Sequence, residues 1–544
     1  MAQSRDVVNT AESPRVRKPS VRETNGAKPG RRSPRLHDCK TIQFLAFRVS
    51  IRAGVRQVHK DRVRNPGGNQ GYLYLAAQLP LTRPRSRGKD RLMSFSLRQF
   101  RFIDLFAGVG GFHHALGAVD FGGECVMAAD IDSDCRNVYS TTWPEMAKEQ
   151  IHGDIRELTQ NEDGTDRSDR EIAKLIPDHD VLCAGFPCQP FSKSGAQLGV
   201  LDSTRGTLFF DIMKIVQAKK PKFLILENVR NLAGPRHADT WRTIVTALRA
   251  NGYRVADIPV VFSPHLLPPE MHGRPQSRDR VFILATRSSD KDLTSEPLIE
   301  RLPQVGWDPN NWNIEDYLLD DSDIENLDRY RLREQEVAWL DAWQHFIQGI
   351  PDDDLPGFPI WVDAFHPKPD IPEGTPDWKA DFLRKNSEFF NRHRTFIRSW
   401  LRKSWIPGEG YRVADFPASR RKFEWQARLA QPTAAERDIW QLTIHMRPSG
   451  VRVKPATYLP ALVAITQTSI IGSRRRRITP IEAGRLQGLP DWVFPRAGVD
   501  DATAYKQAGN GVNVGVVQHV ARSLFASVGV SWGAVPVGNE DAAA

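Results

Sequence analysis

The sequence has few cysteines, only 5 in 544 residues, at positions 39, 125, 135, 183 and 188. No two of them stand in the close paired spacing of a zinc site, and so small a number does not build a disulfide framework. We therefore expect reduced thiols in a cytoplasmic protein, no bound metal, and a nucleophilic role for any cysteine with a function.

Long apolar runs are also missing. No stretch approaches the roughly 20 apolar residues that a membrane helix needs, and no apolar segment follows the charges at the N-terminus. The sequence thus predicts neither a transmembrane helix nor a secretion signal.

The net charge of +10 is unevenly distributed along the chain. The first 100 residues hold 22 of the 75 Lys and Arg but only 6 of the 65 Asp and Glu, so the remainder carries an acidic excess. The overall basicity therefore cannot identify the folded part as a nucleic-acid binder, and such a function has to be argued from motifs.

Residues 1–95 are rich in Arg, Lys, Ser, Pro and Gly, a composition that buries too little apolar surface to fold by itself. We expect this extension to be disordered. It is either a basic arm that holds DNA phosphates without sequence preference, or a dispensable extension ahead of a true start at Met93; the composition favours the second interpretation.

From Phe102 onward, short apolar runs alternate with helical patterns, which predicts a doubly wound α/β domain with a Rossmann-like sheet. The expected strands are Phe102–Phe106, Cys125–Ala129, Val181–Ala184, Phe223–Leu226 and Val281–Ala285. The expected helices are Gly111–Val119, Asp134–Thr142, Thr207–Ala218 and Ala238–Asn251.

A second, smaller domain is predicted in the middle of the chain, because ten of the 14 tryptophans lie between residues 301 and 440. Aromatic residues recur there at helical spacing with arginines between them, typical of a solvated helix face, although a DNA-facing helix stays open. The predicted organisation is an extension at 1–95, a catalytic domain at 96–290 and 476–530, a second domain at 291–475, and a tail at 531–544.

A glycine turn follows the first expected strand, in the order Phe106-Ala107-Gly108-Val109-Gly110-Gly111. Glycines let the backbone approach a ligand, and the helix that follows offers free N–H groups. Asp130 stands about 20 residues further on, where a carboxylate can bind ribose hydroxyls, and Asp154 follows a third strand. Either aspartate could instead cap a helix.

Three further motifs contain reactive side chains. Prolines flank Cys188 in Gly185-Phe186-Pro187-Cys188-Gln189-Pro190, so the thiol lies in a rigid loop at the end of a buried strand. Glu227 ends another apolar strand, where partial burial would raise its pKa; a helix cap is the alternative. Gln276, Arg278 and Arg280 would share one side of an extended segment, which favours an anionic or carbonyl-rich ligand.

The order FAGVGG, GFPCQPFS, ENV, QSRDR, RLQGLP and GNGVNV resembles the C5-cytosine DNA methyltransferases of bacterial restriction–modification systems. The matches run from about residue 102 to 287 and from about 478 to 525. The PCQ and ENV elements in this order are highly specific. The resemblance implies a methyltransferase with S-adenosylmethionine as its cofactor and duplex DNA as its substrate.

By this resemblance Cys188 is the nucleophile, Glu227 is the acid that contacts N3 of the base, and Arg278 and Arg280 hold the base and the reacting loop. The cofactor positions implied are Phe106, Gly108, Gly110, Asp130, Ile131, Asp154, Ile155, Leu208, Asn510 and Val512. Two positions depart from the family pattern: Ile131, where many relatives have an aromatic residue, and Gly511, where Ser is common.

The chemistry implied begins with addition of the Cys188 thiolate to carbon 6, which makes carbon 5 nucleophilic, while Glu227 stabilises the charge at N3. The target cytosine must first rotate out of the duplex. The residues expected to contact DNA are Gln189, Ser192, Ser194, Arg447 and Arg452, with Ser194 in the vacated space. The run Arg474–Arg477 is a further candidate for phosphate contacts, and the middle domain resembles the family's target-recognition region.

Two other functions remain open on the sequence alone: a tRNA cytosine-5 methyltransferase and a catalytically inactive DNA-binding regulator. The large aromatic-rich insert argues against the first, and intact Cys188, Glu227 and Arg280 argue against the second. We expect a cytoplasmic monomer that acts on nucleoid DNA, with a restriction endonuclease as a separate partner. The recognised DNA sequence cannot be read from the chain.

Replacing the predicted nucleophile separates chemistry from cofactor binding. We expect Cys188→Ala to abolish methyl transfer to DNA and to leave the affinity for S-adenosylmethionine nearly unchanged, because the thiol reacts only with the base. Methyl transfer from labelled cofactor and calorimetric titration check the two quantities. A large loss of cofactor affinity in this variant would count against the assignment.

Overall fold

The structure is a computed structural model that describes residues 100–118, 121–187, 208–290, 292–294, 298–462 and 468–530. All of them belong to one compact unit, Lys89–Ala544. The predicted extension at 1–95 and the tail at 531–544 lie outside the described residues. Within the described ranges, no helix combines the length and the apolar character needed to cross a bilayer.

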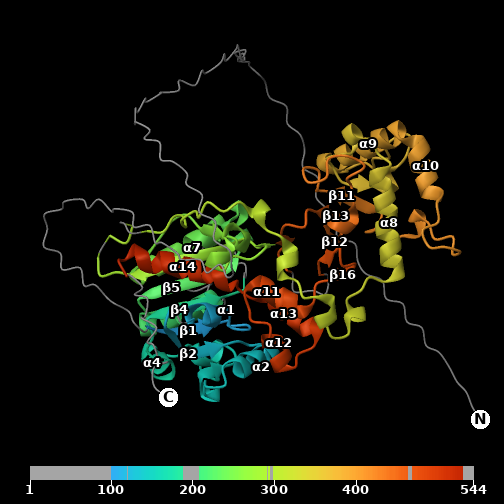
Figure 1. The fold of residues 1–544 in the computed structure, drawn as a ribbon. Helices are drawn as coiled ribbons and strands as arrows, with labels where there is room; N and C mark the ends of the chain where they lie inside the picture. The colour runs from blue at the N-terminus through green and yellow to red at the C-terminus, as the bar shows by residue number, and fades with distance from the viewer. Residues whose placement is uncertain are drawn as a thin grey trace, which may run out of the picture. The chain divides into compact units, whose positions relative to one another are not determined.

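The larger of the described sheets has eight strands, in the order β3-β2-β1-β4-β5-β9-β6, with β7 also pairing with β9 (Figure 1). Strands β1 to β5 are parallel neighbours, and β9 runs antiparallel to β5, β6 and β7. The strand bounds are β1 Phe100–Leu105, β2 Gly123–Ala129, β3 Ile151–His152, β4 Val181–Gly185, β5 Phe223–Val229, β6 Tyr253–Val255, β7 Val260–Phe262 and β9 Arg280–Arg287.

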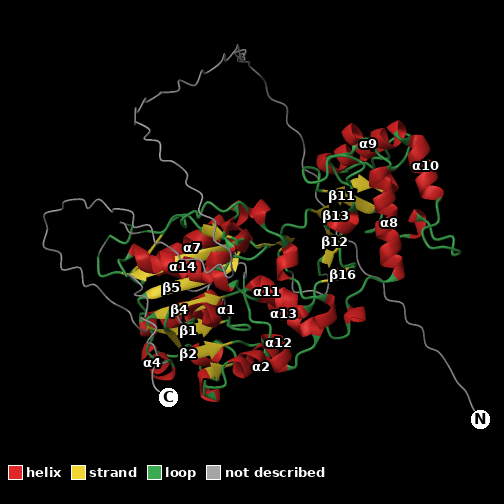
Figure 2. Cartoon of the chain, in the orientation of Figure 1, coloured by secondary structure: helices red, strands yellow, loops and turns green. Residues whose placement is uncertain are grey.

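Helices cover both faces of this sheet, as the apolar runs of its buried strands require (Figure 2). One core joins Phe102 and Cys183 of the sheet to α1 and α14, and a second core joins Leu105 and Leu182 to α4, α6 and α7. The helices are α1 Gly111–Leu116, α2 Ser133–Thr142, α3 Arg156–Thr159, α4 Asp169–Leu175, α6 Leu208–Lys219, α7 Ala238–Ala250, α11 Pro480–Gln487, α12 Val493–Ala497, α13 Asp501–Asn510 and α14 Val514–Ser527.

This arrangement confirms the predicted doubly wound α/β fold. All five predicted strands and all four predicted helices are present within a few residues of their expected ends. The first helix was predicted too long: it stops at Leu116, where the N–H of Gly117 donates to the carbonyl of His113 as a cap. Glycine there lowers the preference for continuing a helix.

A second, smaller sheet lies in the tryptophan-rich part of the chain, in the order β10-β11-β13-β12-β15-β16. Trp343 stacks on Phe423 with a ring-centre distance of 4.6 Å, and its indole N–H donates to the carbonyl of Arg420. These contacts give the segment a core of its own. Its elements are α8 Glu334–Gln348, α9 Asp377–Arg392, α10 Arg394–Arg402, β10 Ile360–Trp361, β11 Lys422–Trp425, β12 Thr443–Arg447, β13 Gly450–Lys454, β15 Ile470–Ile471 and β16 Arg476–Arg477.

The interleaved arginines of α9 and α10 are exposed, as a solvated helix face requires. A DNA-facing role for these helices stays a prediction, as do the exact domain limits. A two-stranded parallel sheet ties the two regions together, because β14 (Leu459–Pro460) pairs with β8 (Gln276–Ser277).

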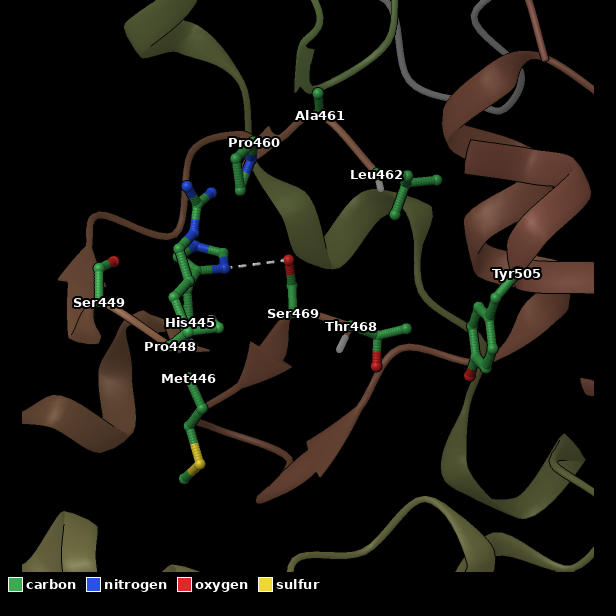
Figure 3. A pocket seen from close by; sticks show the side chains of 11 residues that line it. His445, Met446, Pro448, Ser449, Pro460, Ala461, Leu462, Thr468, Ser469 and Tyr505 are labelled. Atoms are coloured by element: carbon green, nitrogen blue, oxygen red, sulfur yellow. Dashed lines mark hydrogen bonds between the residues drawn. The ribbon is translucent and has the colours of Figure 1, made fainter. Parts of the chain in front are cut away.

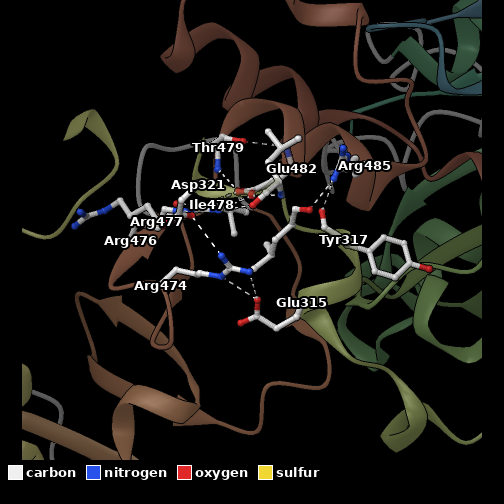
Figure 4. A network of polar contacts seen from close by, with 12 residues as sticks. Glu315, Tyr317, Asp321, Arg474, Arg476, Arg477, Ile478, Thr479, Glu482 and Arg485 are labelled. Atoms are coloured by element: carbon white, nitrogen blue, oxygen red, sulfur yellow. Dashed lines mark hydrogen bonds and ion pairs between the residues drawn. The ribbon is translucent and has the colours of Figure 1, made fainter. Parts of the chain in front are cut away.

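One buried ion pair, between Arg476 and Glu482, connects the second sheet to α11 (Figure 4). The Arg476 guanidinium is 0% exposed; it donates to both carboxylate oxygens of Glu482 at 2.8 and 2.9 Å and to Asp321 at 2.8 Å. Arg477 pairs with Glu336, and Arg474 with Glu315. The prediction that this arginine run contacts DNA is therefore wrong for Arg476, which is fully enclosed by protein.

Breaking this junction should destabilise the fold. We expect Arg476→Met to lower the free energy of unfolding by about 3 kcal/mol, because it leaves the Glu482 carboxylate buried without its cation. Urea denaturation measures the change. The double variant Arg476→Met/Glu482→Gln should recover much of the loss; additive losses would contradict the coupling.

Candidate active site

The candidate site begins at one edge of the larger sheet, where the parallel strands β4 and β5 end. The register of β4 and β5 places Gly185 opposite Glu227. A Cβ atom built on Gly185 would lie 3.7 Å from Oε2 of Glu227, so the absence of a side chain there leaves space beside the carboxylate. The loop that continues from β4 therefore leaves the sheet next to Glu227.

Glu227 is a nearly enclosed carboxylate with one cationic partner. Its side chain is 12% exposed, and its Oε1 lies 2.9 Å from Nε of Arg280. Burial raises the pKa of Glu227 above its ordinary value, and the charges of Arg280 and Arg278 offset part of that rise. The group is consequently easier to protonate than a surface glutamate.

Asn228, which follows Glu227 in β5, holds the start of the loop that leaves β4. Its side-chain amide is buried and donates to the carbonyl oxygen of Phe186 at 2.9 Å. This bond joins β5 to the Phe186-Pro187 segment that leads to residue 188. The sequence reasoning assigned no role to Asn228, although its position inside the ENV motif was an available signal.

Four predicted site residues lie outside the described residues: Cys188, Gln189, Ser192 and Ser194. Their roles stay predictions. The closest described neighbour in sequence is Pro187, which is exposed at the end of the segment that Asn228 holds.

Arg278 is buried and contacts carbonyl oxygens of the protein itself. Its guanidinium donates to Gly509 and Gly511 at 2.8 Å each and to Leu462 at 3.1 Å. The sequence predicted that Arg278 and Arg280 converge on one place. Both influence the pKa of Glu227, but among them only Arg280 pairs with it directly.

The glycine turn after β1 adopts backbone conformations that favour glycine. Gly108 and Gly110 have φ angles of 56° and 79°, and Phe106 has a φ of 57°. A Cβ on Gly110 would come within 2.1 Å of the Trp143 ring, whereas a Cβ on Gly108 would meet nothing within 4 Å. The turn thus packs tightly on one side and has open space at Gly108.

Asp130 lies beside this turn. Its Oδ2 accepts the N–H of Gly108 at 2.8 Å, and its Oδ1 accepts the N–H of Asp132 at 2.9 Å. Asp132, rather than Asp130, caps α2, so the helix-cap alternative does not hold for Asp130. The neighbouring Ile131 is 68% exposed, an unusual exposure for a large aliphatic side chain.

The remaining cofactor candidates are placed on neighbouring elements. Asp154 accepts hydrogen bonds from the backbone N–H and the Nε of Arg156, at 3.0 and 2.9 Å, so it also serves the start of α3. Ile155 is buried, and Leu208 is half-buried at the start of α6.

Residues 509–514, the GNGVNV motif, pack against the glycine turn, as the sequence predicted. A Cβ on Gly111 would lie 2.6 Å from Cγ1 of Val512, so the two segments are in close contact. Asn510 is exposed at the end of α13, and α14 begins at Val514. Val512 thus stands beside Gly111 of the glycine turn.

Of the predicted DNA-contact residues, Arg447 and Arg452 lie on the hairpin of β12 and β13. Arg452 pairs with Glu424 at 2.9 Å. Arg447 has no ion pair with an acidic side chain in the described part of the chain.

Comparison with known proteins identifies the family. The family model for C-5 cytosine-specific DNA methylases matches residues 100–526. The chain belongs to this family. It is 40% identical over 509 residues to the type II methyltransferase M.AluI of Cellulosimicrobium cellulans, covering 79% of this chain and 92% of that protein. It is 38% identical over 434 residues to M.HhaI of Haemophilus parahaemolyticus, covering 79% of this chain and 96% of that protein.

The methylase is thus a DNA (cytosine-5-)-methyltransferase, which confirms the family and enzyme class predicted from its motifs. The roles of individual residues are a separate matter and stay predictions. Among the described ones, Glu227 has the strongest physical case, because it combines burial, a raised pKa and space beside its carboxylate.

The raised pKa of Glu227 makes the pH dependence of the methylase testable. If the protonated acid assists at the base, the rate falls as the pH rises through that pKa, and this descending limb belongs to Glu227. We expect Glu227→Gln to lose the limb, because an amide does not titrate, and to lower single-turnover methyl transfer by about a hundredfold.

Removing the Arg280 cation next to Glu227 should shift the descending limb instead of abolishing it. We expect Arg280→Gln to move the descending limb to higher pH, because the positive charge that favours the carboxylate is gone. Single-turnover rates measured across the pH range check both variants. An unchanged descending limb in Glu227→Gln would assign it to another group.

Proposed function

We propose that this methylase modifies carbon 5 of one cytosine within a specific duplex DNA sequence, through a covalent adduct between Cys188 and a base rotated out of the helix. The observation that carries the proposal is the register of β4 and β5, which places Gly185 opposite Glu227. The segment that leads to Cys188 starts from this point and is held by Asn228.

The proposed chemistry follows from the low nucleophilicity of carbon 5 in an aromatic pyrimidine. The Cys188 thiolate adds to carbon 6, and Glu227 donates its proton to N3, so no negative charge accumulates on the ring. Carbon 5 of the resulting enamine then accepts the methyl group. A base or water removes the carbon 5 proton, which expels the Cys188 thiolate. N3 returns its proton to Glu227, so the ring regains its aromaticity and the acid is regenerated.

The residues around the glycine turn suit S-adenosylmethionine, which supplies the electrophilic methyl group when bound. The backbone at Gly108 faces open space, and the α1 N-terminus at Gly110 has no side-chain cap. The Asp130 carboxylate beside it can accept ribose hydroxyls, and the exposed face of Ile131 can cover a purine ring. Asp154, Ile155, Leu208, Asn510 and Val512 would complete the pocket.

In a duplex, N3 of cytosine is paired with guanine and the faces of the ring are stacked on neighbouring bases, so neither an acid at N3 nor a thiol at carbon 6 has access to the ring. The target base must therefore leave the helix, at a cost of a few kcal/mol for unstacking and unpairing. Gly185 has no side chain, so the end of β4 adds no bulk beside the Glu227 carboxylate, where we propose that the base binds.

In the cell, we propose that the methylase protects host DNA from a separate restriction endonuclease of the same specificity. The type II methyltransferases to which it is similar support this proposal. We expect it to act as a monomer on nucleoid DNA in the cytoplasm.

A mechanism-based trap tests the proposal. Bisulfite sequencing of DNA from a host that expresses the chain first identifies the methylated sequence. A duplex with 5-fluorocytosine at that position should then form a stable covalent complex in the presence of the cofactor. Carbon 5 carries fluorine in place of hydrogen, so there is no proton to remove and the thiolate is not released.

Two controls accompany the trap. Cys188→Ala should form no adduct, and a tRNA carrying 5-fluorocytosine should form none with the wild-type chain. Adducts on tRNA but not on DNA would replace the proposal with a tRNA methyltransferase. DNA binding without adduct or methylation would indicate an inactive regulator.

A further inference from the structure

A cavity of about 300 Å³ lies where the hairpin of β12 and β13 faces the segment around Leu462 (Figure 3). The residues of its wall with polar side chains are His445, Arg447, Ser449, Thr468, Ser469 and Tyr505. Leu462 also lines it, and the carbonyl of Leu462 accepts a hydrogen bond from Arg278. Leu462 therefore contacts both the cavity and Arg278, which also donates to the carbonyls of Gly509 and Gly511.

The hairpin has one apolar face and one polar face. Ile444, Met446, Val451 and Val453 are buried in the core of the second sheet. In the antiparallel register His445 lies opposite Arg452, and Thr443 lies opposite Lys454. Because side chains alternate along a strand, His445, Arg447, Arg452 and Lys454 share the other face.

This polar face carries an excess of positive charge. Glu424 pairs with Arg452 at 2.9 Å, whereas Arg447 and Lys454 form no ion pair with an acidic residue in the described ranges. Burial lowers the pKa of each of these two groups, and repulsion from neighbouring cations adds to that effect. Glu424 attracts Arg447 and Lys454 as well as its partner Arg452, so three cations face one carboxylate. This excess of positive charge indicates a surface that binds an anion such as a DNA phosphate.

His445 differs from these neighbours because it is both buried and uncharged. It is 5% exposed, and its Nδ1 lies 3.1 Å from Oγ of Ser469. Burial, followed by the charges of Arg447, Lys454 and Arg452, lowers its pKa to about 3, so the ring is neutral at physiological pH. Its Nε2 is buried and has no hydrogen-bond partner among the described residues.

A buried ring nitrogen without a partner is costly unless a ligand completes its hydrogen bond. A phosphate would gain little from a neutral ring beside two cations. The edge of a base offers directional donors and acceptors in the major groove, which a neutral ring nitrogen can match.

We propose that His445, held by Ser469, reads the edge of one base of the recognised DNA sequence in this cavity, while Arg447 and Lys454 bind the adjoining phosphates. The proposal rests on the function proposed above, that the substrate is duplex DNA. It makes His445 a specificity-determining residue and Ser469 a positioning residue. The sequence reasoning missed both, because neither belongs to a recognisable motif.

The test compares kcat/KM for methyl transfer on the recognised duplex and on a set of duplexes with single base-pair changes. We expect His445→Ala to reduce discrimination at one base pair by about tenfold and to preserve it at the others. Ser469→Ala should weaken discrimination at the same base pair by a smaller factor. His366→Ala, an exposed histidine elsewhere in the same region, should leave every ratio unchanged.

Arg447→Gln should have a different effect. It should weaken binding to all duplexes alike and reduce the slope of log affinity against log salt by about one. A similarly uniform loss in His445→Ala would make it a phosphate contact and overturn the proposal.

Further outcomes separate the two proposals. If the wild-type chain methylates one sequence and both His445→Ala and His445→Gln keep its discrimination, the role of His445 is overturned and the proposed function stands. If the wild-type chain methylates no duplex, both fail. Thermal unfolding of each variant identifies any that fails to fold. If the His445 variants do not fold, unchanged discrimination in Ser469→Ala overturns the proposal, and weakened discrimination at one base pair supports it.

Discussion

The parallel pairing of β4 with β5 is the constraint on which the rest of the site depends. It places Gly185 opposite Glu227 and so brings the end of one strand beside the acid at the end of the next. Burial raises the pKa of this acid, and the positive charge of Arg280 offsets part of the increase. Asn228 then ties the outgoing loop to the same strand. The chemistry proposed for the methylase requires an acid that can hold a proton, and it requires that the loop leading to residue 188 start beside that acid.

Buried arginines connect this point to distant parts of the chain. Arg278 donates to Leu462 on one side and to Gly509 and Gly511 on the other, so it joins the segment after β14 to the end of α13. Arg476 does the same between the second sheet and α11 through Glu482. Arginine suits such positions because its planar group donates several hydrogen bonds in fixed directions. The second sheet is thereby joined to α11 by a buried ion pair.

The sequence predicted residue ranges for five of the eight strands of the larger sheet, because continuous apolar runs and the glycine turn are local signals; the short strands β3, β6 and β7 were not among them. It also predicted that Val512 returns to the first turn, although only through the family pattern. It did not show that Arg278 contacts the protein's own carbonyl groups, or that Arg476 is buried, because an arginine at a surface and one in a core look alike in a sequence. His445 was missed for a related reason: its burial depends on the pairing of β12 with neighbours distant along the chain.

The most direct test of this account is a crystal structure of the methylase bound to a duplex with 5-fluorocytosine at its target position. We predict a covalent bond from Sγ of Cys188 to carbon 6 of an extrahelical base, with a Glu227 oxygen at hydrogen-bonding distance from N3. A base that remains stacked in the duplex, or a Glu227 that pairs with Arg280 alone while another group contacts N3, would contradict it.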